Sequence, residues 1–195
     1  DEVGEFVFYV MAYVDGETLS DRVRSRGPLP PAEAARIMRE VAWALAYAHA
    51  QGVVHGDLNP ANIPLERATE RALVADFGIA RLATASGETG AGETLGTPEY
   101  MSPEQACGEP VDGRSDLYSL GVVGYFALTG TLHFTGGARE VLAQQVTKLP
   151  APVAQVAPGI PRHVALAIDT SLAKDPAVRH FTGEALAEAL ASNLE

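Results

Sequence analysis

The sequence has little positive charge and almost no cysteine. Lys148 and Lys174 are its only lysines, and 25 acidic residues against 14 lysines and arginines give a formal net charge of −11. This charge argues against unspecific binding to nucleic acid or to an anionic membrane, because both need clustered Lys and Arg. The single cysteine, Cys107, excludes an internal disulfide and a multi-cysteine zinc site, which fits a reducing compartment such as the cytoplasm.

Long apolar runs are also missing. No stretch approaches the length of a membrane span, and no secretory signal opens the sequence, so we expect no membrane contact by this segment. With 47% hydrophobic residues, a chain of 195 residues can nevertheless bury a sizeable core. The simplest expectation is one domain over residues 1–195.

Two acidic loops, separated by a short strand-turn-strand, carry the clearest chemistry. Residues 55–62 read His-Gly-Asp-Leu-Asn-Pro-Ala-Asn, and residues 76–78 read Asp-Phe-Gly. Such loops can bring Asp57, Asn62 and Asp76 to one point. Mg²⁺ prefers hard oxygen ligands beside substrate phosphates, and a second Asp can accept a proton, as metal-assisted phosphoryl transfer requires. The alternative, two ordinary polar turns, does not account for so many fixed offsets.

The compound pattern His-x-Asp-x-x-x-x-Asn followed by Asp-Phe-Gly resembles the protein kinases, and its spelling is closest to bacterial serine/threonine kinases of eukaryotic type. Residues 96–104 are similar to the end of a kinase activation segment, and residues 115–122 to the start of the central large-lobe helix. The resemblance implies an α+β, mainly α fold: a large lobe with a short β-hairpin at the cleft, and a small lobe that is absent or nearly so. Residues 1–16 would be the last small-lobe strand and hinge, and residues 17–195 the helical lobe.

The resemblance also implies catalytic roles. Asp57 would be the base that accepts the substrate hydroxyl proton, and Asn62 and Asp76 would hold Mg²⁺. The hydroxyl group of Thr97 would bridge Asp57 and the substrate-binding loop. The cofactors would be ATP and Mg²⁺, and the partner a protein substrate with Ser or Thr, with no nucleic acid involved. Kinases of this bacterial type are often tethered by a distant membrane helix, so this segment would be cytoplasmic.

Further residues would shape the nucleotide site and support it. The implied cofactor-binding residues are Met11, Ala12, Val14, Pro64, Phe77 and Gly78. His55 would anchor the catalytic loop, and Asp116 would accept hydrogen bonds from the backbone of that loop. Glu104 would form a buried pair with Arg179.

Several positions depart from the kinase pattern. Gly56 stands where the family commonly has Arg, Asn59 stands where it has Lys, and Pro64 removes an amide from the pocket floor. These departures keep open a pseudokinase or binding fragment without catalysis. A second alternative is a small-molecule phosphotransferase of the aminoglycoside or choline kinase type, whose loop commonly reads His-Gly-Asp. Those enzymes generally lack the run seen at residues 96–104.

Helical periodicity is strongest in residues 31–51, where Ile37, Val41 and Leu45 recur at helical spacing. We expect a core helix there, with Trp43 and Tyr47 as packing residues. The other expected helices are residues 18–26, 117–128, 138–148, 161–173 and 183–190, and the expected strands are residues 6–11, 63–65 and 72–75.

Overall fold

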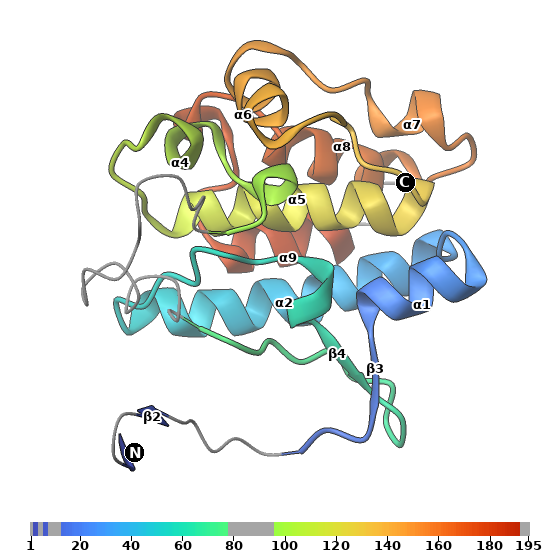
Figure 1. The fold of residues 1–195 in the computed structure, drawn as a ribbon. Coiled ribbons are helices and arrows are strands. Elements are labelled where there is room, and N and C mark those ends of the chain that lie inside the picture. Colours follow the sequence, from blue (N-terminus) through green and yellow to red (C-terminus); the bar gives the residue numbers. More distant parts are fainter. Residues whose placement is uncertain (1, 4–5, 8–12, 78–95, 192–195) are drawn as a thin grey trace.

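The computed structural model describes residues 2–3, 6–7, 13–77 and 96–191, which form a mainly helical body with two small antiparallel sheets (Figure 1). The helices are α1 (Leu19–Arg26), α2 (Pro31–Ala50), α4 (Pro103–Cys107), α5 (Gly113–Thr129), α6 (Ala138–Thr147), α7 (Val153–Val156), α8 (Arg162–Ser171) and α9 (Gly183–Ala191), with 3₁₀ turns η1 (Pro60–Asn62), η2 (Pro98–Tyr100) and η3 (Pro176–Val178). The strands are β1 (Glu2–Val3), β2 (Phe6–Val7), β3 (Gly16–Thr18) and β4 (Pro64–Glu66). The predicted mainly α class is confirmed.

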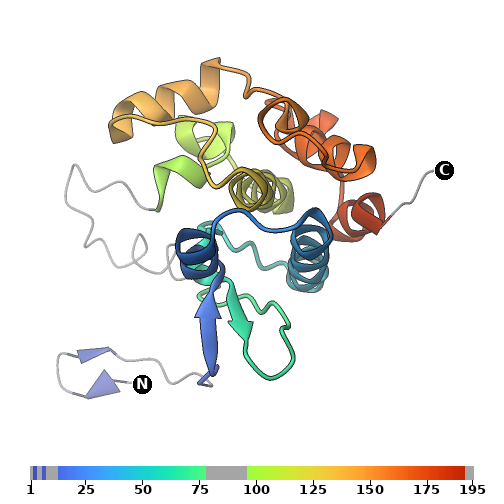
Figure 2. The ribbon, with the colours of Figure 1, turned by 90° about the vertical axis from the view of Figure 1, so that its right-hand side faces the viewer.

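Helix α5 lies at the centre of the fold. Every residue from Ser115 to Leu128 is buried, as expected for a helix that is apolar on all sides. Helices α2 and α8 pack against α5, and α9 packs against both α2 and α8. Figure 2 shows α2 and α5 nearly end on, one beneath the other. In the described part of the chain, no helix combines the length and hydropathy needed to cross a membrane.

The ends of the helices follow signals in the sequence. The Thr18 side chain caps α1 by accepting a hydrogen bond from the backbone amide of Asp21 (3.1 Å), and α1 ends at Gly27. The Asp112 side chain caps α5 in the same way, and Gly130 ends α5 in the left-handed conformation. The predicted boundaries of α1 are nearly correct, whereas α5 begins at Gly113, four residues before the predicted start.

Helix α2 buries one stripe and exposes another. Ile37, Val41 and Leu45 are buried, as predicted, whereas Trp43 and Tyr47 are 51% and 75% exposed. The prediction that these two aromatic residues pack in the core was wrong. Trp43 lies two positions after Val41, which is about 200° around the helix, and Tyr47 follows it on the same outer face.

The sheet beside the candidate site differs from the expected hairpin. Strand β4 pairs with β3, and the predicted strand at residues 72–75 is reduced to one bridge between Leu65 and Ala72. The amides of Leu73 and Ala75 still donate to the carbonyls of Pro64 (2.9 Å) and Asn62 (3.0 Å). Backbone hydrogen bonds thus hold residues 72–75 beside β4 without regular pairing.

The N-terminal strand prediction is tested only in part. Strand β2 pairs with β1, with Glu2 opposite Val7 and Val3 opposite Phe6. The rest of the strand expected at residues 6–11 lies outside the described residues.

Candidate active site

Asp116 holds the catalytic loop from the rear. Its two carboxylate oxygens accept hydrogen bonds from the backbone amides of His55 (2.8 Å) and Gly56 (2.9 Å). The side chain of His49 contacts the same carboxylate, with 2.7 Å between Nε2 and Oδ2. Asp116 is buried in α5, so the central helix of the fold positions residues 55 and 56. The contact between Asp116 and the loop was predicted, and the contribution of His49 was not.

His55 connects the catalytic loop to the second acidic loop. The amide of Asp57 donates to His55 Nδ1 (3.2 Å), so Nε2 carries the proton and donates to the carbonyl of Ala75 (2.9 Å). The His55 ring also packs against the ring of Phe77, with 4.9 Å between centroids. His55 is therefore fully engaged in holding the two loops together, as an anchor would be.

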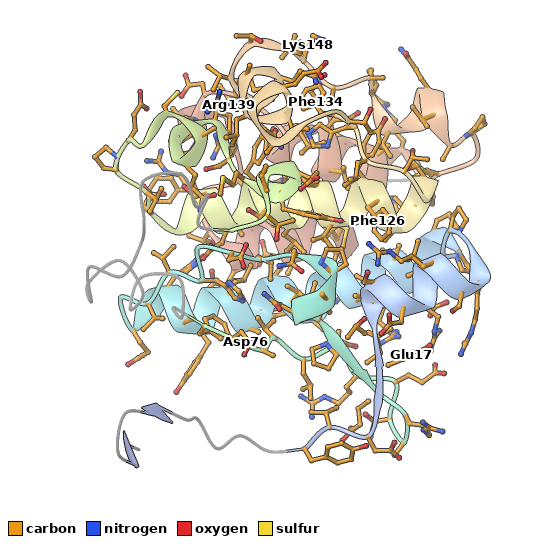
Figure 3. The ribbon with its side chains drawn as sticks, in the orientation of Figure 1. Glu17, Asp76, Phe126, Phe134, Arg139 and Lys148 are labelled. Carbon is orange, nitrogen blue, oxygen red and sulfur yellow. The ribbon has the colours of Figure 1, made fainter. Side chains whose placement is uncertain are left out.

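Asn62 and Asp76 come close together through the backbone. The Asn62 side-chain Nδ2 donates to the carbonyl of Asp57 (3.1 Å), which directs its side-chain oxygen elsewhere. The carbonyl of Asn62 accepts from the amide of Ala75, the residue before Asp76. Figure 3 shows Asp76 on the segment that runs along the lower side of α2.

Asp76 adopts an unusual backbone conformation. Its φ is 64°, in the left-handed region that few residues other than glycine adopt, and its side chain is exposed. Such strained residues cluster at functional sites, where surrounding contacts maintain them. The anchoring of Ala75 by His55 and Asn62 supplies those contacts.

Asp57 is covered on one side by the segment that begins at Gly96. The backbone amide of Thr97 donates to Asp57 Oδ1 (3.1 Å). This contact comes from the backbone amide of Thr97, and the predicted bridge through its hydroxyl group stays a prediction. Gly96 has φ 102°, and a Cβ atom there would lie 3.1 Å from Asp57 Oδ1, so this close approach requires glycine.

Asn59 does not take the place of the kinase lysine. Its side chain is buried, accepts from the amide of Ala61 (3.0 Å) and donates to the carbonyl of Asp57 (3.1 Å). It thereby caps η1, and its polar atoms are used within the loop. No cation reaches substrate from position 59.

A groove of about 770 Å³ borders Asp76. Its walls are mostly apolar and come from residues far apart in the sequence, namely Val14, Trp43, Ala44, Pro64, Val74 and Phe77. Three of the predicted cofactor-binding residues, Val14, Pro64 and Phe77, therefore line one groove together with a predicted metal ligand. The other three, Met11, Ala12 and Gly78, lie outside the described residues.

Glu104 and Arg179 form the expected buried pair. Two hydrogen bonds, of 2.7 and 2.8 Å, join the guanidinium group to the carboxylate, and the Arg179 side chain is fully buried. Arg179 also donates to the carbonyls of Ala173 and Lys174. The pair thus ties α4, which follows the segment beside Asp57, to the loop after α8.

The residues at the site fit a magnesium ion that is shared with a phosphate ligand. Asn62 and Asp76 offer an amide oxygen and a carboxylate, which are hard oxygen ligands. Within the ranges that the structure describes, no group of three or more His, Cys, Asp or Glu could form a metal cage. Mg²⁺ commonly binds through one or two carboxylates and substrate phosphates, so a cage is not required.

Three polar side chains near Asp57 have contacts that sequence reasoning missed. Gln105 donates to the carbonyl of Gly56 (2.7 Å), Ser119 to that of Tyr100 (2.7 Å), and Gln145 to that of Glu99 (2.8 Å). For Gln145 a signal existed, because a polar residue stands four positions after Val141 on the buried face of α6.

The comparisons with known proteins all indicate the same family. A family model described as "Protein kinase domain" matches residues 2–189. Serine/threonine-protein kinase pkn2 of Myxococcus xanthus is 42% identical over 98% of this chain, and PknB of Mycobacterium leprae is 42% identical over 92%. PknA of Mycobacterium tuberculosis is 38% identical over 97%.

The chain spans only part of each of these proteins: 24% of pkn2, 29% of PknB and 43% of PknA. The crystal structure of the Mycobacterium tuberculosis PknI kinase domain superposes with a TM-score of 0.73 and 29% sequence identity, covering 92% of this chain and 63% of that chain. The sequence motifs, the fold and these matches agree: the chain belongs to the protein kinase family.

Proposed function

We propose that the chain is the large-lobe part of a serine/threonine protein kinase, which transfers the γ-phosphate of ATP to Ser or Thr hydroxyls of a protein. In this proposal residues 17–195 belong to this lobe, and residues 1–16, where the structure has the short strands β1 and β2, supply the end of the small lobe and the hinge. The names of the relatives support the reaction, since pkn2, PknB and PknA are each called serine/threonine-protein kinases.

One observation carries the proposal. Two hydrogen bonds, Ala75 to Asn62 and His55 to Ala75, join the two acidic loops, and a third, Asn62 to Asp57, holds the first loop together. The second loop borders an apolar groove. The groove suits a planar base, and the oxygens of Asn62 and Asp76 suit the magnesium ion that ATP carries. Magnesium, when bound, would neutralise charge on the phosphates.

In this arrangement Asp57 accepts the proton. The Thr97 amide occupies Oδ1, so Oδ2 is the oxygen left to face a substrate hydroxyl. The hydroxyl oxygen forms a bond to the γ-phosphorus as the bond to the departing ADP oxygen breaks, and the hydroxyl proton passes to Asp57. The Asp116 carboxylate binds the backbone of this loop and keeps the loop in place before substrate arrives.

A second candidate, a pseudokinase that acts by binding a partner, rests on Asn59. Kinases commonly have lysine at this position, and here the buried side chain caps η1 and cannot reach a phosphate. The lost cation would weaken phosphate transfer without weakening partner binding.

The proposal also covers location and partners. ATP is the donor and a protein bearing Ser or Thr is the acceptor. The chain carries a free, exposed Cys107. A cytoplasmic location fits these partners and the free thiol, because reduced thiols persist there. Anchoring would come from regions outside residues 1–195.

Phosphate transfer from labelled ATP tests the proposal. The protein, expressed with any sequence that flanks residues 1–195 in its gene, should label Ser and Thr of a generic protein substrate, and not an aminoglycoside or choline. Asp76→Asn should raise the Mg²⁺ concentration needed for half-maximal rate by about tenfold or more, because one carboxylate ligand is lost.

The control is Asp21→Asn, the same change at an exposed carboxylate in the first turn of α1. It should leave the Mg²⁺ requirement unchanged. A protein that binds a partner protein but transfers no phosphate to any of the three acceptors would favour the pseudokinase.

A further inference from the structure

Gln145 is a fully buried polar side chain that contacts the segment beside Asp57. Its side chain is 0% exposed, although it lies in α6, a helix of which only one face is buried. Its Nε2 donates to two consecutive carbonyls of η2, those of Glu99 (2.8 Å) and Pro98 (3.3 Å). A buried amide that makes these contacts fixes the path of the η2 backbone.

A chain of donors fixes which way the Gln145 amide points. Lys174 Nζ can only donate, and it donates to the hydroxyl oxygen of Tyr118 (2.9 Å). The Tyr118 hydroxyl then donates to Gln145 Oε1 (2.6 Å), which leaves Gln145 Nε2 for the carbonyls of η2. The direction of the chain therefore runs from Lys174 through Tyr118 and Gln145 to the backbone.

Two aromatic rings hold Lys174 at the start of this chain. Its ammonium nitrogen lies 4.9 Å from the centre of the Phe134 ring and 5.2 Å from that of Tyr118. Figure 3 labels Phe134 beside α6. Burial and the nearby Arg179 lower the pKa of Lys174 to about 8, so at pH 7 Nζ is mostly the ammonium group, which can only donate.

The far end of the chain reaches Asp57. The residue before η2 is Thr97, whose amide contacts Asp57 Oδ1, and Ser119 holds the carbonyl of Tyr100 at the end of η2. Movement of η2 would therefore change the covering of Asp57 directly.

We propose that Gln145 is a positioning residue, which holds the segment from Thr97 to Tyr100 on Asp57 and so sets how a protein substrate is presented to that carboxylate. This role rests on the proposed kinase function. Lys174 and Tyr118 act through Gln145 by fixing the direction of its amide.

The substitution Gln145→Glu tests the proposal with almost no change in shape. The introduced carboxylate keeps an acceptor for Tyr118 but turns an oxygen toward the carbonyls of Pro98 and Glu99, where a donor is needed. We expect kcat/KM for the protein substrate to fall about tenfold or more, while the KM for ATP stays unchanged. Amide hydrogen exchange of residues 99–101 should become faster.

A pH profile separates positioning from a general loss of stability. Burial raises the pKa of the introduced carboxyl group, and its protonated form regains a donor. The ratio of mutant to wild-type kcat/KM should therefore recover between about pH 8 and about pH 5.5. Lys174 and His133, whose Nε2 lies 3.4 Å from Gln145 Oε1, also titrate beside this position, so the same profile of Gln145→Met, which has no carboxyl group, serves as the baseline.

The matched control is Gln144→Glu, the same change one residue earlier in α6. Gln144 is also buried and donates to a carbonyl, but that carbonyl belongs to Thr135, away from η2. It should leave kcat/KM and the exchange of residues 99–101 unchanged. Where Gln145→Glu does not fold, Gln145→Met removes the same donor without adding charge, and the same losses are expected except the recovery at low pH.

Two results would overturn the proposal: equal behaviour of the variants at positions 144 and 145, or unchanged exchange of residues 99–101 in the variant at 145. The exchange measurement does not depend on catalysis. If the wild-type protein transfers no phosphate but exchange rises only in the variant at 145, Gln145 does hold η2, and the proposed kinase function fails together with the presentation of substrate that rests on it.

Discussion

Replacing Asp57 with Asn should lower kcat for phosphate transfer by about 10²–10⁴-fold, the usual contribution of a positioned general base. The amide has nearly the shape of the carboxylate, and its oxygen can still accept from the Thr97 amide, so the loop should keep its structure. What is lost is the capacity of Oδ2 to take a proton. The affinity for MgATP, measured by calorimetry, should stay within about twofold of the wild-type value.

The control for this prediction is again Asp21→Asn, which changes an exposed carboxylate of α1 that accepts from the Thr18 hydroxyl and takes no part in the proposed chemistry. It should retain the wild-type kcat. If Asp57→Asn kept more than about a tenth of the wild-type kcat, another group would have to be the base.

Replacing Arg179 with Met should lower the free energy of unfolding by about 3–5 kcal/mol, because an unpaired carboxylate then stays buried. Glu104 would lose both hydrogen bonds from the guanidinium group while keeping the one from Ser115, and the carbonyls of Ala173, Lys174 and Arg114 would lose a donor. Urea unfolding of both proteins measures the difference.

Arg114→Met provides a matched control. Arg114 forms an ion pair of the same 2.7 Å length, with Asp112, but its side chain is 30% exposed against 0% for Arg179. Exposed pairs contribute about 0–1 kcal/mol, so this variant should unfold almost like the wild type. Equal losses in the two variants would show that burial of the Arg179 pair has no special effect.

The pair of Glu104 and Arg179 also predicts that the stability of the fold falls in acid. Burial alone would raise the pKa of the Glu104 carboxyl group, but hydrogen bonds from Arg179 and Ser115 outweigh it and leave the pKa below its ordinary value of 4.5. The pair therefore stabilises the fold fully above that value and loses its effect as the pH falls through the lowered pKa. Arg179→Met should remove this part of the acid dependence.

Much of the fold could be predicted, because local signals mark it. Thr18 and Asp112 cap their helices, Gly27 and Gly130 end them, and the buried run after Ser115 predicts a central helix. The helical periodicity also indicates that Trp43 lies on the outer face of α2, because of its position relative to Val41. The prediction for Trp43 did not use this signal. Large aromatic residues are usually buried, and that expectation was given too much weight.

The contacts between loops were less accessible to sequence reasoning. The kinase-like motifs predicted that Asp116 meets the backbone of residues 55 and 56, and that Glu104 meets Arg179. They did not reveal that the backbone of Thr97 contacts Asp57, or that residues 72–75 fail to form a regular strand. Backbone atoms are the same at every position, so only the coordinates distinguish an amide contact from a hydroxyl contact.

The position of a bound metal ion tests the central claim most directly. A crystal structure of the protein with Mn²⁺ and a non-hydrolysable ATP analogue would locate the metal by its anomalous signal. The account predicts Mn²⁺ about 2.0–2.3 Å from the Asn62 side-chain oxygen and an Asp76 carboxylate oxygen, with the γ-phosphate facing Asp57. A metal bound elsewhere, or a nucleotide whose phosphates lie away from Asp57, would contradict it.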